Sequence, residues 1–113
     1  MWLLKVKVEL LSEITTTTPA TLRVMPGAMK TIGRAPTADF TLDCTLVSRL
    51  HCRLISTNDR LEVEDLDSTN GTFVNEQQVK RKMLTSGDTL RIGQVELTIS
   101  EESAPQGFLV YYY

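Results

Sequence analysis

The chain has 113 residues, of which 42% are hydrophobic and 23% charged, and its formal net charge is −2. This length fits one domain, and the composition is that of a chain that can bury a core rather than that of a disordered tail. A nonspecific nucleic-acid-binding domain would carry a basic excess to neutralise phosphates, and this chain has none.

The cysteine content and the hydropathy pattern set further limits. Cys44, Cys52 and His51 are too few ligands for a structural zinc site, and one cysteine pair is weak evidence for a secreted disulfide scaffold. No stretch approaches the roughly twenty apolar residues of a membrane-spanning helix, and residues 1–11 lack a signal-peptide cleavage site. We therefore expect an intracellular protein with free thiols, no metal or other cofactor, and no membrane association.

Short alternations of apolar and polar residues, broken by turn residues, run through the chain and favour β-strands. No segment has the pattern of an amphipathic helix. About ten to eleven such strands predict an all-β fold, a two-sheet antiparallel β-sandwich. The strands are expected in the ranges 2–10, 22–25, 30–34, 40–42, 52–56, 60–65, 71–75, 78–79, 89–92 and 95–99.

The boundaries of the sandwich follow from where the alternation stops. Residues 12–19 hold a run of threonines before a proline and are expected to form a loop. We expect the domain to occupy residues 1–102. Residues 103–113 are apolar and aromatic after a Pro/Gly break, so they form either a tail that folds back on the sandwich or, as we expect, the start of a following element.

Polar clusters stand at the expected strand ends, where a sandwich displays binding residues. The clusters are Gly33-Arg34, the stretch from Ser48 to His51, and the loop Ser68-Thr69-Asn70-Gly71-Thr72, which is followed by Asn75. In this order and spacing they resemble the forkhead-associated (FHA) domain family, over about residues 22–99. The resemblance implies a phosphothreonine-peptide-binding recognition module for phosphorylation-dependent protein–protein interaction, and not an enzyme.

The family resemblance implies a role for each residue of these loops. A phosphothreonine carries nearly two negative charges and three acceptor oxygens, which a guanidinium fork matches. Arg34 is implied as the principal phosphate contact, with Arg49 as a second cation. Ser48 would donate its hydroxyl and backbone N–H to the phosphate, and Thr69 would bond the phosphate or shape the pocket. Asn70 would hydrogen-bond the peptide backbone beside the phosphothreonine.

The remaining matched residues are implied as structural support of the site. The ring of His51 would bond neighbouring loops and hold Ser48 in place. Gly71 would allow the tight turn of its loop, and Gly33 and Asn75 are implied as further structural support of the site.

A narrower resemblance rests on Met1-Trp2 and the apolar segment after residue 107. These features are similar to the start of nibrin-like DNA-repair proteins, in which an FHA domain runs into BRCT repeats. The resemblance implies phosphorylated partners in the DNA damage response, meaning double-strand-break repair or checkpoint signalling. It also implies adjacent BRCT repeats and a location in the nucleus.

Three other classes compete with this interpretation. An FHA-fold module with a phosphate-independent dimerisation or scaffolding role is the first, and the presence of Arg34, Ser48 and Asn70 argues against it. A hydrolase that uses Cys44 or Cys52 with His51 is disfavoured because His51 and Cys52, adjacent on a strand, would point to opposite faces. No orienting acid or oxyanion loop can be identified for it either. Direct nucleic-acid binding is disfavoured by the net charge and by the lack of stacked aromatic motifs.

Overall fold

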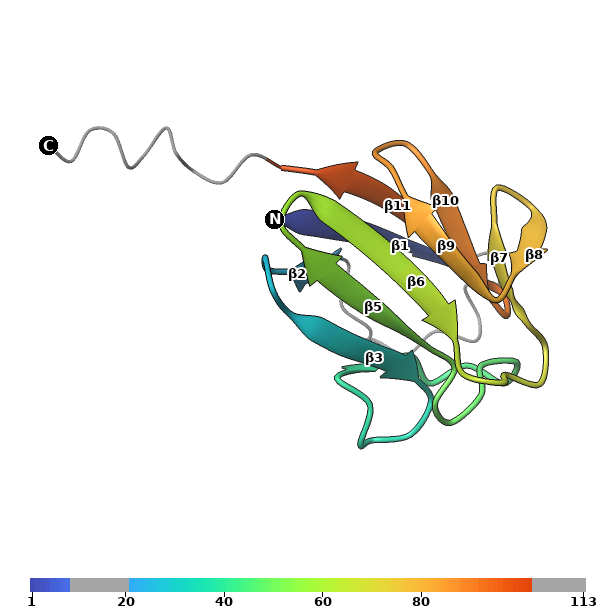
Figure 1. Cartoon of the computed structure of the whole chain (residues 1–113). Coiled ribbons are helices and arrows are strands. Elements are labelled where there is room, and N and C mark those ends of the chain that lie inside the picture. Colours follow the sequence, from blue (N-terminus) through green and yellow to red (C-terminus); the bar gives the residue numbers. More distant parts are fainter. Residues whose placement is uncertain (9–20, 103–113) are drawn as a thin grey trace, which may run out of the picture.

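The computed structural model describes residues 1–8 and 21–102, and these residues form two β-sheets packed face to face (Figure 1). The all-β sandwich predicted from the sequence is confirmed. The eleven strands of the described part are β1 (Trp2–Val8), β2 (Thr21–Val24), β3 (Met29–Gly33), β4 (Phe40–Thr41), β5 (Cys52–Thr57), β6 (Arg60–Asp65), β7 (Thr72–Val74), β8 (Gln77–Val79), β9 (Arg81–Leu84), β10 (Thr89–Ile92) and β11 (Val95–Glu101).

One sheet has six strands in the order β2-β1-β11-β10-β7-β8, and the other has five in the order β4-β3-β5-β6-β9. Neighbouring strands are antiparallel except β3 and β4, which pair in parallel at Ile32–Phe40 and Gly33–Thr41. The fully antiparallel sandwich of the prediction is therefore wrong at this pair. Residues 34–39 bring the chain back so that β4 runs in the same direction as β3, whereas a hairpin would reverse the strand direction.

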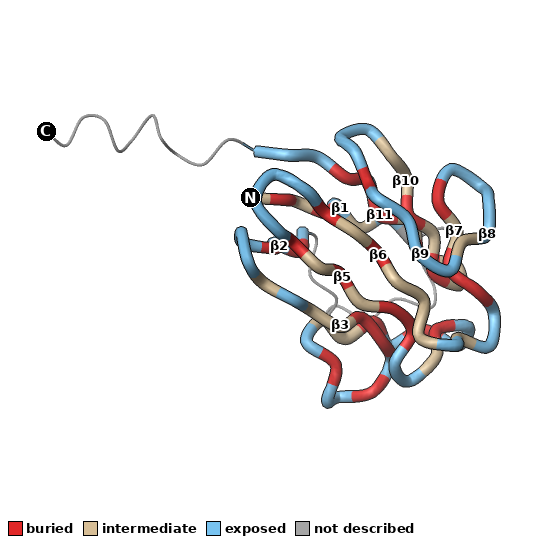
Figure 2. The backbone as a smooth tube through the Cα atoms, viewed as in Figure 1, coloured by how far each residue is buried: buried red, intermediate tan, exposed pale blue. Residues whose placement is uncertain are grey.

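The core lies between the sheets and is made by alternate residues of the strands (Figure 2). In β11, Val95, Leu97 and Ile99 are buried while Thr98 and Ser100 are exposed. A slip of one residue in the pairing would turn this apolar set to solvent, so the burial pattern fixes the register. The core continues into the loops, where Leu42 and Val47 are also buried.

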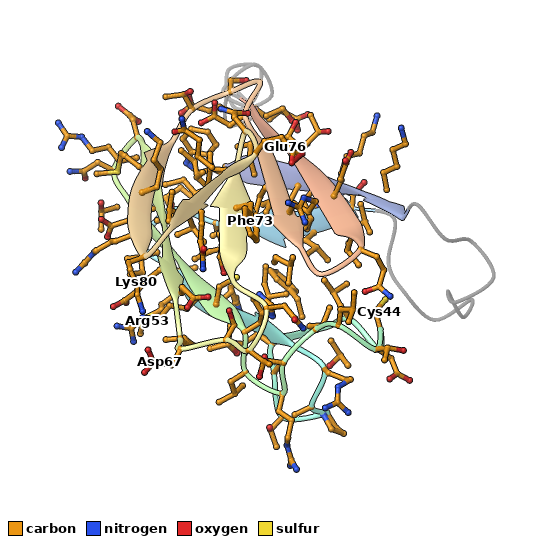
Figure 3. All side chains as sticks on the ribbon, turned by 90° about the vertical axis from the view of Figure 1, so that its right-hand side faces the viewer. Cys44, Arg53, Asp67, Phe73, Glu76 and Lys80 are labelled. Carbon is orange, nitrogen blue, oxygen red and sulfur yellow. The ribbon has the colours of Figure 1, made fainter. Side chains whose placement is uncertain are left out.

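The outer faces of the sheets are covered by charged side chains that pair across strands. Arg53 and Glu64, opposite each other on β5 and β6, form an ion pair of 2.6 Å. On the other sheet, the guanidinium of Arg91 lies 4.3 Å from the ring centroid of Phe73, its cross-strand neighbour, and contacts Glu76. Figure 3 labels Phe73 on β7 and Glu76 in the turn that follows it. Such pairs favour the observed strand partners.

Most predicted strand bounds shift by one or two residues, and two further differences have a clear physical reason. The turn between β7 and β8 is formed by Asn75 and Glu76, with φ of 50° and 69°. The strand expected to reach residue 75 therefore ends one residue earlier, at Val74. A two-residue turn with positive φ at both positions matches the twist of a hairpin, and Asn tolerates that φ. β9 was not predicted, because it lies at a sheet edge and buries only Leu84.

Some predicted segments lie outside the residues that the structure describes. The loop expected at 12–19 and the segment 103–113 lie outside the described residues, as do residues 9 and 10 of the first expected strand. Within residues 1–8 and 21–102, there is no helix long and apolar enough to cross a membrane.

Candidate functional site

The loops with the predicted site residues lie together at one end of the sandwich (Figure 1). They connect β3 to β4, β4 to β5, and β6 to β7. Backbone hydrogen bonds extend the β3–β5 ladder into this end: Arg34 N–H donates to Ser48 O (2.9 Å), and Ala35 N–H donates to Arg49 O (3.1 Å). The first two loops are therefore joined along their backbones.

Gly33 is required where these loops meet. A Cβ added to Gly33 would lie 2.0 Å from the carbonyl oxygen of Arg49 and 2.9 Å from the Cα of Leu50. Both are backbone atoms, which cannot swing aside as a flexible side chain can. Any larger residue at position 33 would separate the two loops.

The guanidinium of Arg34 is exposed and is held at a single nitrogen. Its Nε donates to the carbonyl oxygen of Val47 at 3.0 Å, and its terminal nitrogens make no hydrogen bond to the described residues. The bond at Nε fixes the direction of the side chain and leaves a fork of donors directed to solvent. Arg49, on the joined loop, is also exposed.

Ser48 connects the second loop to the third. Its Oγ accepts the backbone N–H of Thr69 at 2.9 Å, and its own N–H donates to Nδ1 of His51 at 3.0 Å. The Ser48 N–H, which was expected to donate to a phosphate, donates to His51 in this structure. The hydroxyl hydrogen of Ser48 is the donor that remains for a ligand.

Thr69 and Asn70 are exposed at the tip of the third loop. Nδ2 of Asn70 donates to the carbonyl oxygen of Leu46 at 3.0 Å, across to the second loop. An amide group has two N–H donors and one acceptor oxygen. This bond therefore leaves Oδ1 and one N–H of Asn70 for a ligand.

The ring of His51 is fully buried and joins the second loop to the third. Because Nδ1 accepts the Ser48 N–H, Nε2 carries the hydrogen and donates to the carbonyl oxygen of Gly71 at 2.8 Å. Burial lowers the pKa of His51, while the carbonyl of Gly71 and the charge of Asp65 act in the opposite direction more weakly. His51 is thus a neutral ring with a defined tautomer.

Asp65 organises the third loop, a role that the sequence analysis did not assign. Its carboxylate accepts hydrogen bonds from the N–H and hydroxyl of Ser68 and from the hydroxyl of Thr72, and Ser68 Oγ accepts the N–H of Gly71. Burial raises the pKa of Asp65, but these hydrogen bonds outweigh it, so the pKa lies below its usual value. The signal was present in part, because Asp side chains that bond nearby backbone groups are typical of turns.

Asn75 is the one predicted support residue that lies away from these loops. Its Nδ2 donates to Asp88 Oδ1, and its Oδ1 accepts the N–H of Thr89, both at 3.0 Å. These bonds join the β7–β8 turn to the start of β10 at the other end of β7. The loop end, by contrast, brings together the five residues predicted to bind the phosphopeptide, which are Arg34, Ser48, Arg49, Thr69 and Asn70. The support residues Gly33, His51 and Gly71 lie at the contacts between these loops.

The geometry also bears on the thiol hypothesis. Cys52 is fully buried on β5, and burial raises the pKa of its thiol far above neutrality. Both ring nitrogens of His51 are engaged in hydrogen bonds with the loops. A buried neutral thiol beside an engaged imidazole does not form a nucleophile–base pair.

Residues 30–93 match the FHA domain family. Two curated relatives are the oxoglutarate dehydrogenase inhibitor of Corynebacterium diphtheriae and the glycogen accumulation regulator GarA of Mycobacterium tuberculosis. Each is 39% identical, over 71 and 70 residues, which is 63% and 62% of this chain. The matched segments cover 50% and 43% of those proteins, so this chain corresponds to half of their length or less.

Solved structures give the same family. An FHA domain studied for its phosphothreonine-dependent interactions is 29% identical, with a TM-score of 0.76, and the match covers 91% of this chain and 98% of that one. The FHA domain of FhaA, in complex with the intracellular domain of Rv3910, is 30% identical with a TM-score of 0.72, covering 88% and 99%.

These relatives correct part of the sequence analysis. The curated relatives come from bacteria, which have no nucleus, so the predicted nuclear location is wrong. The nibrin-like identity, the DNA-repair setting and the adjacent BRCT repeats find no support among them. The match spans more than half of the chain. FHA domains themselves are binding modules for phosphorylated proteins rather than catalytic domains, and this chain belongs to the FHA domain family.

Proposed function

We propose that this chain binds a phosphothreonine-containing segment of a partner protein at the loop end of the sandwich. The proposal rests on one observation: each of three consecutive residues, Leu46, Val47 and Ser48, accepts a hydrogen bond from a residue of the site. Asn70 bonds Leu46 O, Arg34 Nε bonds Val47 O, and the N–H of Thr69 bonds Ser48 Oγ. Donors held in place before the ligand arrives cost less to order on binding.

The phosphate would lie between the first and second loops. The terminal nitrogens of Arg34 would donate to two phosphate oxygens, and the hydroxyl of Ser48 would donate to the third. Arg49 would add a second positive charge, and Thr69 would border the phosphate from the third loop. Because the chain as a whole carries −2, the attraction is confined to this local pair of arginines.

The peptide backbone would be held by Asn70. Its free Oδ1 can accept a peptide N–H while its remaining N–H donates to a peptide carbonyl. An extended peptide that has no partner strand needs such a two-way contact to satisfy its backbone groups. The Leu46 carbonyl keeps the amide plane of Asn70 oriented for it.

The biological setting that we propose is regulation of a partner protein by its phosphorylation on threonine. The names of the curated relatives describe an inhibitor of a metabolic enzyme and a regulator of glycogen accumulation, which supports a regulatory binding role over a DNA-repair role. The phosphate-independent dimerisation alternative is left as an outcome of the test.

The test uses an oriented phosphothreonine peptide library, followed by calorimetry on the selected peptide. We expect a dissociation constant on the order of micromolar, or about −8 kcal/mol, and no binding of the unphosphorylated peptide. The phosphoserine peptide should bind at least about fivefold more weakly, since a buried methyl contributes roughly 0.8 kcal/mol and its loss loosens the phosphate geometry. Equal binding with and without phosphate would overturn the proposal. Concentration-dependent dimers that ignore the phosphopeptide would favour the alternative.

A further inference from the structure

The segment Leu46-Val47-Ser48 supports most of the ordered groups of the site. Besides the three bonds named above, the backbone oxygen of Ser48 accepts the N–H of Arg34 at 2.9 Å. Val47 anchors the segment because its side chain is 1% exposed within the core. Leu46 has no such anchor, since its side chain is 46% exposed. The position of Leu46 therefore depends on its buried neighbours Cys44 and Val47 and on what its own backbone touches.

The backbone of Leu46 rests on the opposite sheet, at the turn between β10 and β11. A Cβ added to Gly93 would lie 3.1 Å from the carbonyl carbon, the carbonyl oxygen and the Cβ of Leu46. Contacts of this length are tighter than normal van der Waals packing, so a side chain at position 93 would displace Leu46. The carbonyl oxygen that it would displace is the acceptor for Asn70.

We infer that Gly93 is a positioning residue for the phosphopeptide site, acting through Leu46 on the side chains of Asn70 and Arg34. This inference rests on the proposed function. A shift of Leu46 by a few tenths of an ångström would turn the amide of Asn70. It would also move the neighbouring Val47 carbonyl that holds Arg34.

Other glycines of the chain provide matched controls. Gly93 has φ of +62°, and Gly27 and Gly87 also have positive φ, of +82° and +97°. An alanine at any of the three would therefore be strained. A Cβ at Gly27 or Gly87, however, would meet no atom within 4 Å. Because the φ values of Gly27 and Gly87 lie further from the left-handed region that other residues adopt, the two controls carry at least as much backbone strain as Gly93→Ala, without the contact to Leu46.

The experiment measures thermal stability and the dissociation constant of one phosphothreonine peptide for Gly93→Ala, Gly27→Ala and Gly87→Ala. All three substitutions should lower the melting temperature. Gly93→Ala alone should raise the dissociation constant, by at least about fivefold, as expected for coupling between groups in contact. If the dissociation constant of Gly93→Ala stays within about twofold of the controls, the inference is wrong.

A low-strain pair keeps the test decisive if Gly93→Ala does not fold. Asn adopts positive φ more readily than Ala, so Gly93→Asn adds the Cβ at lower cost, and Gly27→Asn is its control. Gly93→Asn should weaken the peptide, and Gly27→Asn should not. Equal dissociation constants for this pair would also overturn the inference.

A ligand-free measurement separates failure of this inference from failure of the proposed function. The NMR signals of the Asn70 side-chain amide and of Arg34 Nε–H should shift in the Gly93 variants and stay unchanged in the Gly27 variants. Unshifted signals would overturn the positioning role even if the wild-type chain binds phosphothreonine. Shifted signals in a chain that ignores phosphate would support the positioning role and reject the proposed function.

Discussion

The two ends of the sandwich are held together in different ways. At the end with the turns 25–28, 57–60 and 85–88, two of the turns are closed by local bonds: Ala28 N–H donates to Met25 O, and Thr85 N–H donates to the Asp88 carboxylate three residues away. Long-range bonds also occur at this end, such as Gly27 N–H to Ser56 O, but they hold no residue of the candidate site. At the loop end, side chains of Arg34, His51 and Asn70 bond backbone groups 13, 20 and 24 residues away in sequence.

This difference separates stability from recognition. The bonds of the turn end hold no ligand-binding group, so a change there can lower stability without moving the candidate site. A site closed by long-range bonds exists only when the whole sandwich is assembled, and each bond that is removed frees a ligand-binding group. Substitutions at the turn end should therefore change stability alone, and substitutions at the loop end should change binding.

His51→Ala should have the largest effect, because His51 is buried and joins two loops. The substitution leaves the Ser48 N–H and the Gly71 carbonyl without partners and creates a cavity, which together should cost about 2–4 kcal/mol of folding free energy. Phosphopeptide binding should weaken as Ser48 is released. Urea denaturation and calorimetry measure the two effects. Asp88→Ala, at the turn end, is the control and should lower stability without changing the dissociation constant.

Arg34→Ala should change binding rather than stability. The substitution removes the guanidinium fork and should cost at least about 2 kcal/mol of binding free energy. The melting temperature should hardly move, because the side chain is exposed and loses one bond to Val47. Arg60→Ala removes an exposed arginine at the turn end and should leave binding unchanged. Loss of folding in Arg34→Ala would show that this arginine belongs to the scaffold.

Asn70→Ala sharpens the contrast within the loop end itself. Asn70 is exposed, so its loss should leave the melting temperature nearly unchanged. Binding should weaken by about 1 kcal/mol or more, since the peptide backbone loses its hydrogen bonds. If Asn70→Ala unfolds more readily than His51→Ala and still binds the peptide normally, then Asn70 is a scaffold residue and not a peptide contact.

The pH dependence of stability near neutral pH should arise from His51, at the loop end. Burial lowers the pKa of His51 in the folded chain below its unfolded value of about 6.5. Between the two pKa values the unfolded chain binds the proton and the folded chain does not, so stability rises with pH in that window. His51 therefore contributes fully above about pH 6.5 and progressively less below it. Denaturation of wild type and His51→Ala from pH 7.5 to 5.5 measures this, and equal slopes would contradict it.

The fold class was accessible from the sequence because strand alternation and turn residues are local signals. Val95, Leu97 and Ile99 carry the alternation in the sequence as clearly as in the structure. β9 was missed because an edge strand with one buried residue has no alternation to detect. The parallel pairing of β3 with β4 was missed because strand direction depends on the path of residues 34–39.

The site residues were identified by motif, but their internal bonds were not. Sequence spacing brought Ser48 and His51 into one motif, yet it could not show that the Ser48 N–H donates to the ring. The support that Gly93 gives to Leu46 comes from the opposite sheet and leaves no local pattern. Such contacts are set by the packing of the two sheets and need the structure.

Ser56→Ala should have the smallest effect and the opposite sign. The Oγ of Ser56 is buried between the sheets and has no hydrogen-bond partner among the described residues, while the backbone groups of Ser56 bond Ala28 and Gly27. Removing an unpaired buried hydroxyl should leave stability unchanged or raise it by up to about 1 kcal/mol. Ser68→Ala is the matched control, because that hydroxyl bonds Asp65 and Gly71 and its loss should destabilise the chain. Urea denaturation compares the two variants, and a clear loss of stability in Ser56→Ala would show that its hydroxyl has a partner in solution.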